Sequence, residues 1–328
     1  MTINIGFIGT GGFTRHHVQI LSSFDHVNVV GFVGSSQEKA EKFAEEFSGT
    51  NGYASLEEMM AKEKLDAVYI CVPPMGHESY EKTLIENQIP FFVEKPLGLE
   101  EEAVREIKHL VEERNHLTSV GYHFRYADIV DKWMELNHTV TTGMVTAGWM
   151  GSMPPVYWWK NQALSGGQFN EQTTHLVDLI RYLYGEVQSV YAVENQTSAA
   201  QSDDTVTVAD VGSFTLTMDS GIVVQVANTS VLPGGLGDVH IKAYTNKGMV
   251  TWRMKELEVA TVGKKSIYSA KTNPYHEEAK AFLQAVETGD RSFILSSYED
   301  AWQSFKIAIA ARRSIEENRV IDLKEITD

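Results

Sequence analysis

The first 122 residues alternate short apolar runs with helical stretches, and this alternation constrains the fold more than any other feature. Runs such as Ile3–Ile8 and Val27–Val33 have the length of buried strands, and a helical pattern follows each of them. Strands that alternate with helices are typical of βαβ units, in which the strands run parallel. The sequence therefore predicts an α/β fold whose N-terminal domain, residues 1–122, is a doubly wound parallel sheet.

The pattern changes beyond residue 122. Runs such as Val187–Asn195 and Asp238–Thr245 alternate apolar and polar residues, as in an antiparallel sheet with two different faces. Helical periodicity occurs three times in this half, at about residues 172–184, 275–288 and 298–317. We therefore expect a second, α+β domain over residues 123–328, built on a large, mostly antiparallel open sheet.

Charge and cysteine content exclude several classes of function. The 28 basic and 44 acidic residues give a formal net charge of −16, whereas nucleic-acid and membrane surfaces are bound by basic faces. The only cysteine, Cys71, lies in an apolar run, so neither an intramolecular disulfide nor a zinc–thiolate site is expected. Because no secretion signal or membrane-length apolar span is seen, we expect a cytoplasmic protein without nucleic-acid or membrane partners.

A glycine-rich turn follows the first predicted strand and leads directly into a helix. It reads Gly9-Thr10-Gly11-Gly12-Phe13-Thr14. Its first two glycines allow a tight turn and let the backbone approach a pyrophosphate, whose charge the helix N-terminus stabilises. Thr14 stands where the G-x-G-x-x-G/A pattern has a third small residue, which predicts looser packing of helix on strand. In this context the turn predicts a Rossmann site for NAD(P).

The end of the second predicted strand bears on the choice between NAD and NADP. It reads Val33-Gly34-Ser35-Ser36-Gln37 and holds no carboxylate. A carboxylate there would bind the ribose 2′-hydroxyl, whereas a 2′-phosphate needs neutral or basic partners. Ser35 and Ser36, with Lys39 or Lys42 nearby, slightly favour NADP, and a plain polar turn before a helix is the alternative.

Lys95 is the first candidate for chemistry. It lies in Val93-Glu94-Lys95-Pro96, where the proline biases the lysine towards an extended backbone. At the carboxyl edge of a parallel sheet Lys95 would project into the ligand crevice and hold a substrate hydroxyl or shuttle its proton. A surface salt bridge with Glu94 explains the local pattern equally well.

His175 is the second candidate. A Gly166-Gly167 turn precedes a predicted helix in which Glu171 and His175 are four residues apart and share one side. Alcohol oxidation needs a base for the hydroxyl proton, and imidazole has a suitable pKa. Asp178 is placed to orient the imidazole, and a buried histidine satisfied by Asp178 is the alternative. A glutamate and a histidine without a third ligand do not predict a metal site.

His123 and Trp159 are further candidates for binding substrate. His123 follows the last strand of the first domain, at the domain junction where a ligand would lie. Trp159 precedes the Gly-Gly turn, and an aromatic ring there suits either the apolar face of a sugar or core packing. His16 and His17, on the first helix, are interpreted as structural or solvent-facing.

These segments together resemble the Gfo/Idh/MocA family of oxidoreductases, named after glucose-fructose oxidoreductase and inositol dehydrogenase. The resemblance covers nearly the whole chain, and the Glu94-Lys95-Pro96-Leu97-Gly98 segment is its most specific part. The other segments that carry it are Gly9–Thr14, Cys71–His77, Gly166-Gly167 ahead of His175, and residues 298–323. The resemblance implies reversible hydride transfer at a sugar, cyclitol or related carbon, and subunit contacts through the C-terminal sheet.

The resemblance also implies roles for single residues. Lys95 matches the family's active-site lysine and His175 its acid/base histidine. Glu171 falls where many members have aspartate, so its longer arm changes the proton-relay geometry. Phosphate and nicotinamide contacts are implied for Gly9, Gly11, Gly12, Phe13, Pro73, Pro74, His77 and Glu94.

We therefore expect an NAD(P)-dependent dehydrogenase or reductase that acts on the CH–OH groups of a sugar, cyclitol or related polyol. It would be a homodimer or homotetramer. One alternative is a non-catalytic sensor or regulatory protein of the same fold, which would need neither Lys95 nor His175. Another is a hydrolase or lyase that keeps nicotinamide as an internal redox cofactor.

Overall fold

The computed structural model describes residues 2–77, 79–198 and 203–328, which form two compact units. The first unit combines Met1–His123 with Asn273–Trp302, and the second combines Phe124–Thr272 with Gln303–Asp328. The stretch Asn273–Trp302 thus packs with the N-terminal part of the chain, although it is far from it in sequence. Because compact units need not coincide with domains, the division at residue 122 stays a prediction.

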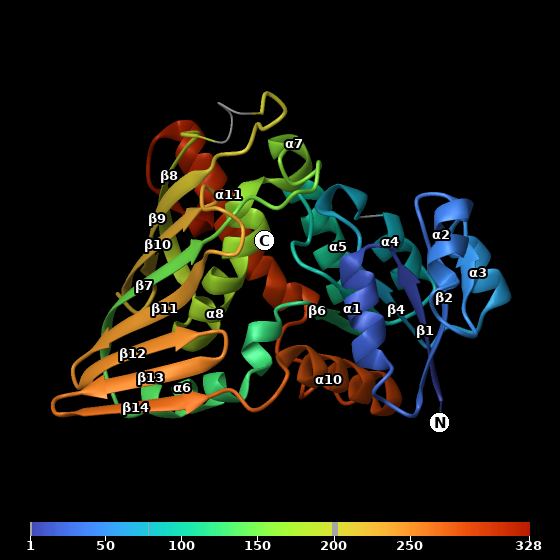
Figure 1. Cartoon of the computed structure of the whole chain (residues 1–328), viewed down its shortest axis with the longest axis horizontal. Coiled ribbons are helices and arrows are strands. Elements are labelled where there is room, and N and C mark those ends of the chain that lie inside the picture. Colours follow the sequence, from blue (N-terminus) through green and yellow to red (C-terminus); the bar gives the residue numbers. More distant parts are fainter. Residues whose placement is uncertain (1, 78, 199–202) are drawn as a thin grey trace. The chain divides into compact units, whose positions relative to one another are not determined.

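A six-stranded sheet forms the centre of the first unit, with strand order β3-β2-β1-β4-β5-β6 (Figure 1). The strands are β1 Ile3–Ile8, β2 Val27–Val33, β3 Asn51–Tyr53, β4 Ala67–Ile70, β5 Phe91–Val93 and β6 Thr118–Val120. Every neighbouring pair is parallel. The predicted doubly wound sheet is confirmed, and its order reverses between β1 and β4, where such sheets bind ligands beyond the carboxyl ends of the strands.

Helices cover this sheet, and apolar side chains fill both of its faces. The helices are α1 Gly12–Leu21, α2 Gln37–Ala44, α3 Leu56–Lys62, α4 Ser79–Glu86, α5 Glu101–Arg114 and α10 Pro274–Thr288, with a short η1 at Pro74–Gly76. The core includes Phe7, Phe32 and Tyr69 from the strands and Phe282 from α10. The strands therefore read as continuous apolar runs because neither face meets water.

A nine-stranded sheet organises the second unit, in the order β14-β13-β12-β11-β7-β10-β9-β8-β15. Its strands are β7 Thr142–Met150, β8 Val187–Asn195, β9 Val211–Met218, β10 Val223–Thr229, β11 Asp238–Thr245, β12 Gly248–Arg253, β13 Glu256–Thr261, β14 Lys264–Ser269 and β15 Ile321–Asp322. Only β7 and β10 pair in parallel. The predicted, mostly antiparallel sheet is confirmed.

Helices of the second unit lie against one face of its sheet (Figure 1). They are α6 Asp128–Asn137, α7 Gln162–Ser165, α8 Thr174–Tyr184 and most of α11 Tyr298–Glu317, with short turns at His123–Tyr126 (η2), Phe169–Thr173 (η3) and Leu323–Glu325 (η4). In β7, Val145 and Ala147 are buried whereas Met144 is exposed, which gives the predicted alternation of faces. No helix of the described residues is long and apolar enough to cross a bilayer.

Candidate functional site

The glycine turn after β1 has the shape that a pyrophosphate requires. Gly9 has a φ of 115°, and a Cβ there would lie 2.5 Å from the carbonyl oxygen of Cys71. Around Gly11 and Gly12, by contrast, an added Cβ would meet nothing within 4 Å. Gly11 caps α1 without a side-chain hydrogen bond, and the first N–H groups of a helix have no partner within it. The turn therefore leaves open space beside a positively polarised helix end.

The tip of β2 carries two hydroxyl groups and a lysine. Ser36 caps α2 by accepting a hydrogen bond from the backbone N–H of Lys39 at 3.3 Å. The Lys39 Nζ donates to the Ser35 hydroxyl at 3.0 Å, and all three residues are exposed. This local arrangement places an ammonium and a hydroxyl together at the predicted ribose end of the site.

Pro73 and Pro74 lie after β4, and the next segment of the chain contains a buried pair of His77 and Glu81. Pro74 begins the η1 turn and is buried. His77 Nδ1 lies 2.8 Å from Glu81 Oε1, and both side chains are buried. His77 Nε2 is also buried and has no hydrogen-bond partner among the described residues. His77 is therefore held by α4 at the carboxyl edge of the sheet, where the sequence placed it.

Glu94 lies at the end of β5 and bonds to a histidine of α1. Its Oε1 accepts a hydrogen bond from His17 Nε2 at 2.7 Å, and both side chains are buried. A Cβ at Gly121 would lie only 2.8 Å from the other carboxylate oxygen, so a residue larger than glycine would clash with Glu94 in this position. Burial alone raises the pKa of Glu94, but the His17 hydrogen bond and the Lys95 charge hold it below its usual value. The predicted surface pair of Glu94 and Lys95 is thus replaced by a buried carboxylate next to a half-buried lysine.

His123 is stacked on an aromatic ring that sequence reasoning did not single out. Its ring lies 3.9 Å from that of Tyr275, with 14° between the planes. The ring of His16 meets Tyr275 edge-on at 4.5 Å. Burial lowers the pKa of His123 to about 3, so the side chain is neutral. Tyr275 lies in α10, so this helix contributes an aromatic ring that contacts both His16 and His123.

His175 lies on α8 in the second unit, among aromatic rings. Gly166 ends α7 with a φ of 73°, and Gly167 follows with a φ of 83°. The chain then enters the helical segment that carries His175, which is only 7% exposed. The ring of Trp149 is nearly parallel to the imidazole at 6.0 Å, and that of Phe124 is tilted at 5.2 Å. These rings limit the positions that the imidazole can take.

A π-helical turn, rather than the predicted α-helix, carries Glu171. The sequence predicts a helix from about residue 172, but the α-helical part begins at Thr174 after the π-helical segment Phe169–Thr173. Glu171 and His175 are therefore joined by a π-helical and then an α-helical stretch instead of by one continuous α-helix. The Gln168 amide donates to the Trp149 carbonyl at 3.3 Å and the Thr229 carbonyl at 3.1 Å, which ties this turn to β7 and β10.

Asp178 forms a buried ion pair with Arg125, and its suggested part in orienting His175 stays a prediction. Arg125 donates to the two carboxylate oxygens at 2.8 and 2.6 Å, and both side chains are buried. Ser304 donates a further hydrogen bond to Asp178 at 2.7 Å. A two-pronged guanidinium–carboxylate pair is among the stronger polar contacts of a protein. Asp178 thus fixes α8 within the second unit.

Trp159 is 2% exposed and packs against Val206 and Val208. This burial agrees with core packing, the alternative to a sugar-binding role in the sequence analysis. Trp159 thus belongs to a small apolar cluster of the second unit.

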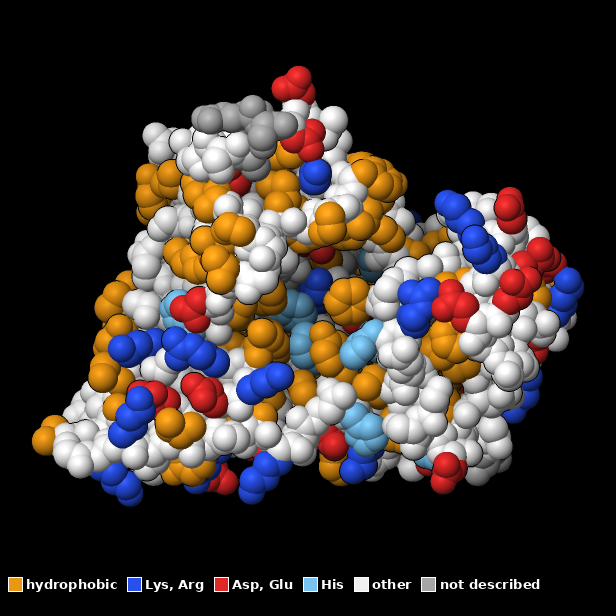
Figure 2. Space-filling view, in the orientation of Figure 1, with side chains coloured by type: hydrophobic (Ala, Val, Ile, Leu, Met, Phe, Trp, Pro, Cys, Tyr) orange, Lys and Arg blue, Asp and Glu red, His pale blue; other side chains and the backbone are white. Residues whose placement is uncertain are grey.

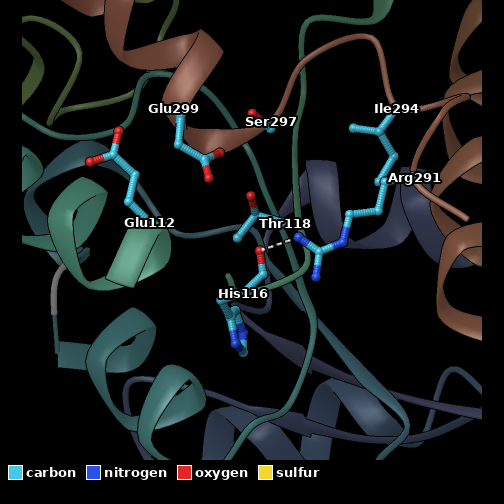
Figure 3. A pocket seen from close by; sticks show the side chains of 7 residues that line it. All are labelled: Glu112, His116, Thr118, Arg291, Ile294, Ser297 and Glu299. Atoms are coloured by element: carbon cyan, nitrogen blue, oxygen red, sulfur yellow. Dashed lines mark hydrogen bonds between the residues drawn. The ribbon is translucent and has the colours of Figure 1, made fainter. Parts of the chain in front are cut away.

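A cavity of about 460 Å³ lies at another part of the first unit (Figure 3). Thr118, on its wall, begins β6, so this cavity opens at the amino end of that strand, whereas doubly wound sheets bind ligands beyond the carboxyl ends. Its lining residues are Glu112, His116, Thr118, Arg291, Ile294, Ser297 and Glu299. Arg291 is already bonded to the carbonyl groups of Asn115 and His116.

The described residues contain no cluster of three or more potential metal ligands.

Comparison with known proteins adds an independent line of evidence. Residues 3–122 match the oxidoreductase family with an NAD-binding Rossmann fold, GFO_IDH_MocA, and residues 139–251 match a GFO/IDH/MocA C-terminal domain. The chain belongs to the Gfo/Idh/MocA family. It is an NAD-binding oxidoreductase.

Relatives of known name and structure align with almost the whole chain. The inositol 2-dehydrogenase of Rhizobium meliloti is 27% identical over 98% of this chain and 100% of its own. A putative NADPH-dependent oxidoreductase from Desulfitobacterium hafniense superposes with a TM-score of 0.89, at 17% identity and 99% coverage of both chains. GenD2 from gentamicin A biosynthesis, solved with NAD, has a TM-score of 0.84 at 22% identity, covering 98% of this chain and 96% of its own. The two structural matches show a shared fold.

Valine at Gly11 tests the glycine turn of this family member directly. Because an added Cβ meets nothing in the chain, Gly11→Val should leave thermal stability without ligand unchanged. Its side chain would occupy the space of the pyrophosphate, and a clash of about 1–3 kcal/mol should raise the Kd for NAD by about five- to 150-fold. Isothermal titration calorimetry measures this, with Gly143→Val, at an equally open exposed position in β7, as the control. Unchanged NAD affinity in Gly11→Val would contradict the assignment of the turn.

Proposed function

We propose that this oxidoreductase transfers hydride between a nicotinamide cofactor and a hydroxyl-bearing carbon of a sugar, cyclitol or related polyol. The observation that carries the proposal is the half-buried Lys95 beside the buried Glu94, directly after the carboxyl end of β5. An ammonium held there by a fixed carboxylate suits the oxygen of an alcohol or carbonyl group. The inositol 2-dehydrogenase that aligns along the whole chain supports a cyclitol among the possible substrates.

The residues of the first unit fit a dinucleotide. The open turn at Gly11 and Gly12 would hold the pyrophosphate, and Pro73, Pro74 and His77 would border the nicotinamide end. When bound, the nicotinamide ring supplies the acceptor or donor of the hydride. Thr14 is fully buried beside Gly9, so this larger residue is accommodated within the turn.

Two side chains of the protein would act on the reacting hydroxyl: one would stabilise the charge on its oxygen, and the other would accept or return its proton. Lys95 would hold the oxygen and stabilise the negative charge that grows on it. His175 would accept the hydroxyl proton in oxidation and return it in reduction. Its burial among the rings of Phe124 and Trp149 supports a fixed base, and the buried Glu171 is a candidate for passing the proton onwards.

Alanine substitutions separate catalysis from cofactor binding. Lys95→Ala and His175→Ala should each lower kcat by about a hundredfold or more, because each removes a group that acts on the substrate oxygen. The Kd for the cofactor should change little. Steady-state kinetics with a panel of inositols, sugars and polyols, together with cofactor titration, measures both quantities. His109→Ala, at an exposed position on α5, is the control. Wild-type turnover in both variants would rule out the proposed roles.

We further propose a preference for NADP. The Lys39 ammonium and the Ser35 hydroxyl, 3.0 Å apart, are joined at the tip of β2, and both suit a 2′-phosphate. The segment from Ser35 to Gln37 holds no carboxylate that would select the 2′-hydroxyl of NAD.

Lys39→Ala tests this preference. Loss of one charge-assisted hydrogen bond, worth about 1.5–3 kcal/mol, should raise the Kd for NADP by about tenfold or more and leave the Kd for NAD unchanged. Fluorescence titration with the two reduced cofactors measures the difference. Lys42→Ala, on the same helix and also exposed, is the matched control. Equal effects on both cofactors would contradict a phosphate contact at Lys39.

We also propose that the chain forms a homo-oligomer through the outer face of its nine-stranded sheet. Across three neighbouring strands the outward-facing Val223, Met144 and Tyr244 are in register, and Met249 on β12 extends this row. All four side chains are exposed. Charged side chains gather over the β11–β14 end of this unit (Figure 2). An apolar row of this kind is typical of a surface that another subunit covers.

Met144→Glu places a charge in the middle of that row. Burying an unpaired charge is costly, so the variant should dissociate into monomers that keep the native fold. Sedimentation velocity of the wild type and the variant measures the change. Val262→Glu, at a fully exposed turn outside the row, is the control. A monomeric wild type, or an unchanged assembly in Met144→Glu, would overturn the proposed interface.

A further inference from the structure

A histidine of the cofactor-binding helix reaches the residue that precedes the active-site lysine. His17 lies in α1, whose N-terminus follows the glycine turn, and Glu94 follows β5. These elements are joined by the 2.7 Å hydrogen bond from His17 Nε2 to Glu94 Oε1. The His17 side chain is 1% exposed and that of Glu94 is 8% exposed, so water does not replace the bond.

The Glu94 carboxylate lies between the backbone of Gly121 and the imidazole of His17. Gly121 stands so close that a Cβ would lie within 3.1 Å of both carboxylate oxygens. On the other side, His17 is packed by the rings of Tyr69 at 5.4 Å and Phe92 at 5.1 Å. Its imidazole therefore has little freedom to leave the carboxylate.

The hydrogen bond also shows which ring nitrogen of His17 faces the carboxylate. An ionised carboxylate only accepts hydrogen bonds, so the proton lies on His17 Nε2. His17 Nδ1 is buried without a hydrogen-bond partner among the described residues. His17 is therefore the donor of the pair, and the Glu94 carboxylate is the acceptor.

We propose that His17 is a positioning residue for Lys95: it holds Glu94 as a fixed anion beside the lysine, and so fixes the ammonium that binds the reacting oxygen. This inference rests on the proposed function of Lys95. It assigns to α1 a second task besides phosphate binding, because the same helix then sets the electrostatics of the reaction centre.

Loss of the His17 donor should make the reaction depend on pH in a new range. In the wild type the pKa of Glu94 is below its usual value, so the anion persists at neutral and mildly acidic pH. Without the hydrogen bond, burial raises that pKa, and Glu94 becomes protonated as the pH falls towards it. Among the described residues, His17, Lys95 and His123 lower the pKa of Glu94, and the Glu94 charge in turn raises the pKa of His16, Cys71 and Tyr275.

His17→Phe and His17→Gln form the test. Phenylalanine keeps a ring without a donor, whereas glutamine restores an N–H near the position of Nε2. With an inositol or sugar that the wild type oxidises, His17→Phe should shift the acidic limb of the kcat profile upwards by about one pH unit or more, with little change in KM. His17→Gln should return the limb towards that of the wild type. His109→Phe, at an exposed position, is the control.

A second readout does not depend on turnover. The Glu94 carboxyl carbon, assigned by comparison with Glu94→Gln, is titrated by carbon-13 NMR in the protein without added cofactor. Its midpoint should rise in His17→Phe and return in His17→Gln. If the Phe variant does not fold, His17→Asn replaces it, because the shorter amide does not reach Glu94.

The outcomes separate this inference from the proposed function. A wild type that oxidises no sugar or polyol refutes the function, while the Glu94 titration still decides whether His17 holds the anion. An unchanged Glu94 midpoint in His17→Phe overturns the inference. So does a loss of kcat that is equal at every pH and is not restored by glutamine, since that pattern indicates only a structural role.

Discussion

The close approach of Gly9, after β1, to Cys71, after β4, is the constraint on which the glycine turn and the start of α1 depend. At Gly9 the backbone takes a positive φ and comes so near the Cys71 carbonyl that no side chain fits. This approach allows α1 to start directly at the edge of the sheet, with its N-terminus facing open space around Gly11. The phosphate-binding geometry thus follows from one residue's lack of a side chain.

The two sheets pack in different ways, and this difference explains where their polar groups and their exposed apolar side chains lie. The parallel sheet is apolar on both faces, so its polar groups are confined to the strand ends. The described helices of the second unit lie against one face of the nine-stranded sheet (Figure 1), and the row at Met144 and Tyr244 is exposed. In the second unit, a buried ion pair joins Arg125 to Asp178, which lies in α8. Because the two opposite charges are paired, neither is left uncompensated away from water.

Sequence patterns predicted the elements whose stability comes from apolar burial. β1, β2, β8 and α11 have the predicted bounds. The short strand β3 was missed because Asn51-Gly52-Tyr53 has no apolar run; a Cβ at Gly52 would lie 2.2 Å from the backbone of α2. The π-helical turn at Glu171 was also missed, because no residue type marks the extra residue of such a turn.

The candidate site likewise contains residues that a local sequence motif marks and residues that only tertiary packing brings together. Local motifs mark Gly11 and Lys95, since the backbone around them sets their roles. His17 and Tyr275 carry no motif, and only the folded chain places them at Glu94 and His123. A buried carboxylate is stable only where a donor from elsewhere in the chain reaches it. The partner of such a group is therefore decided by tertiary packing, and a histidine that reads as structural in the sequence becomes the group that keeps Glu94 charged.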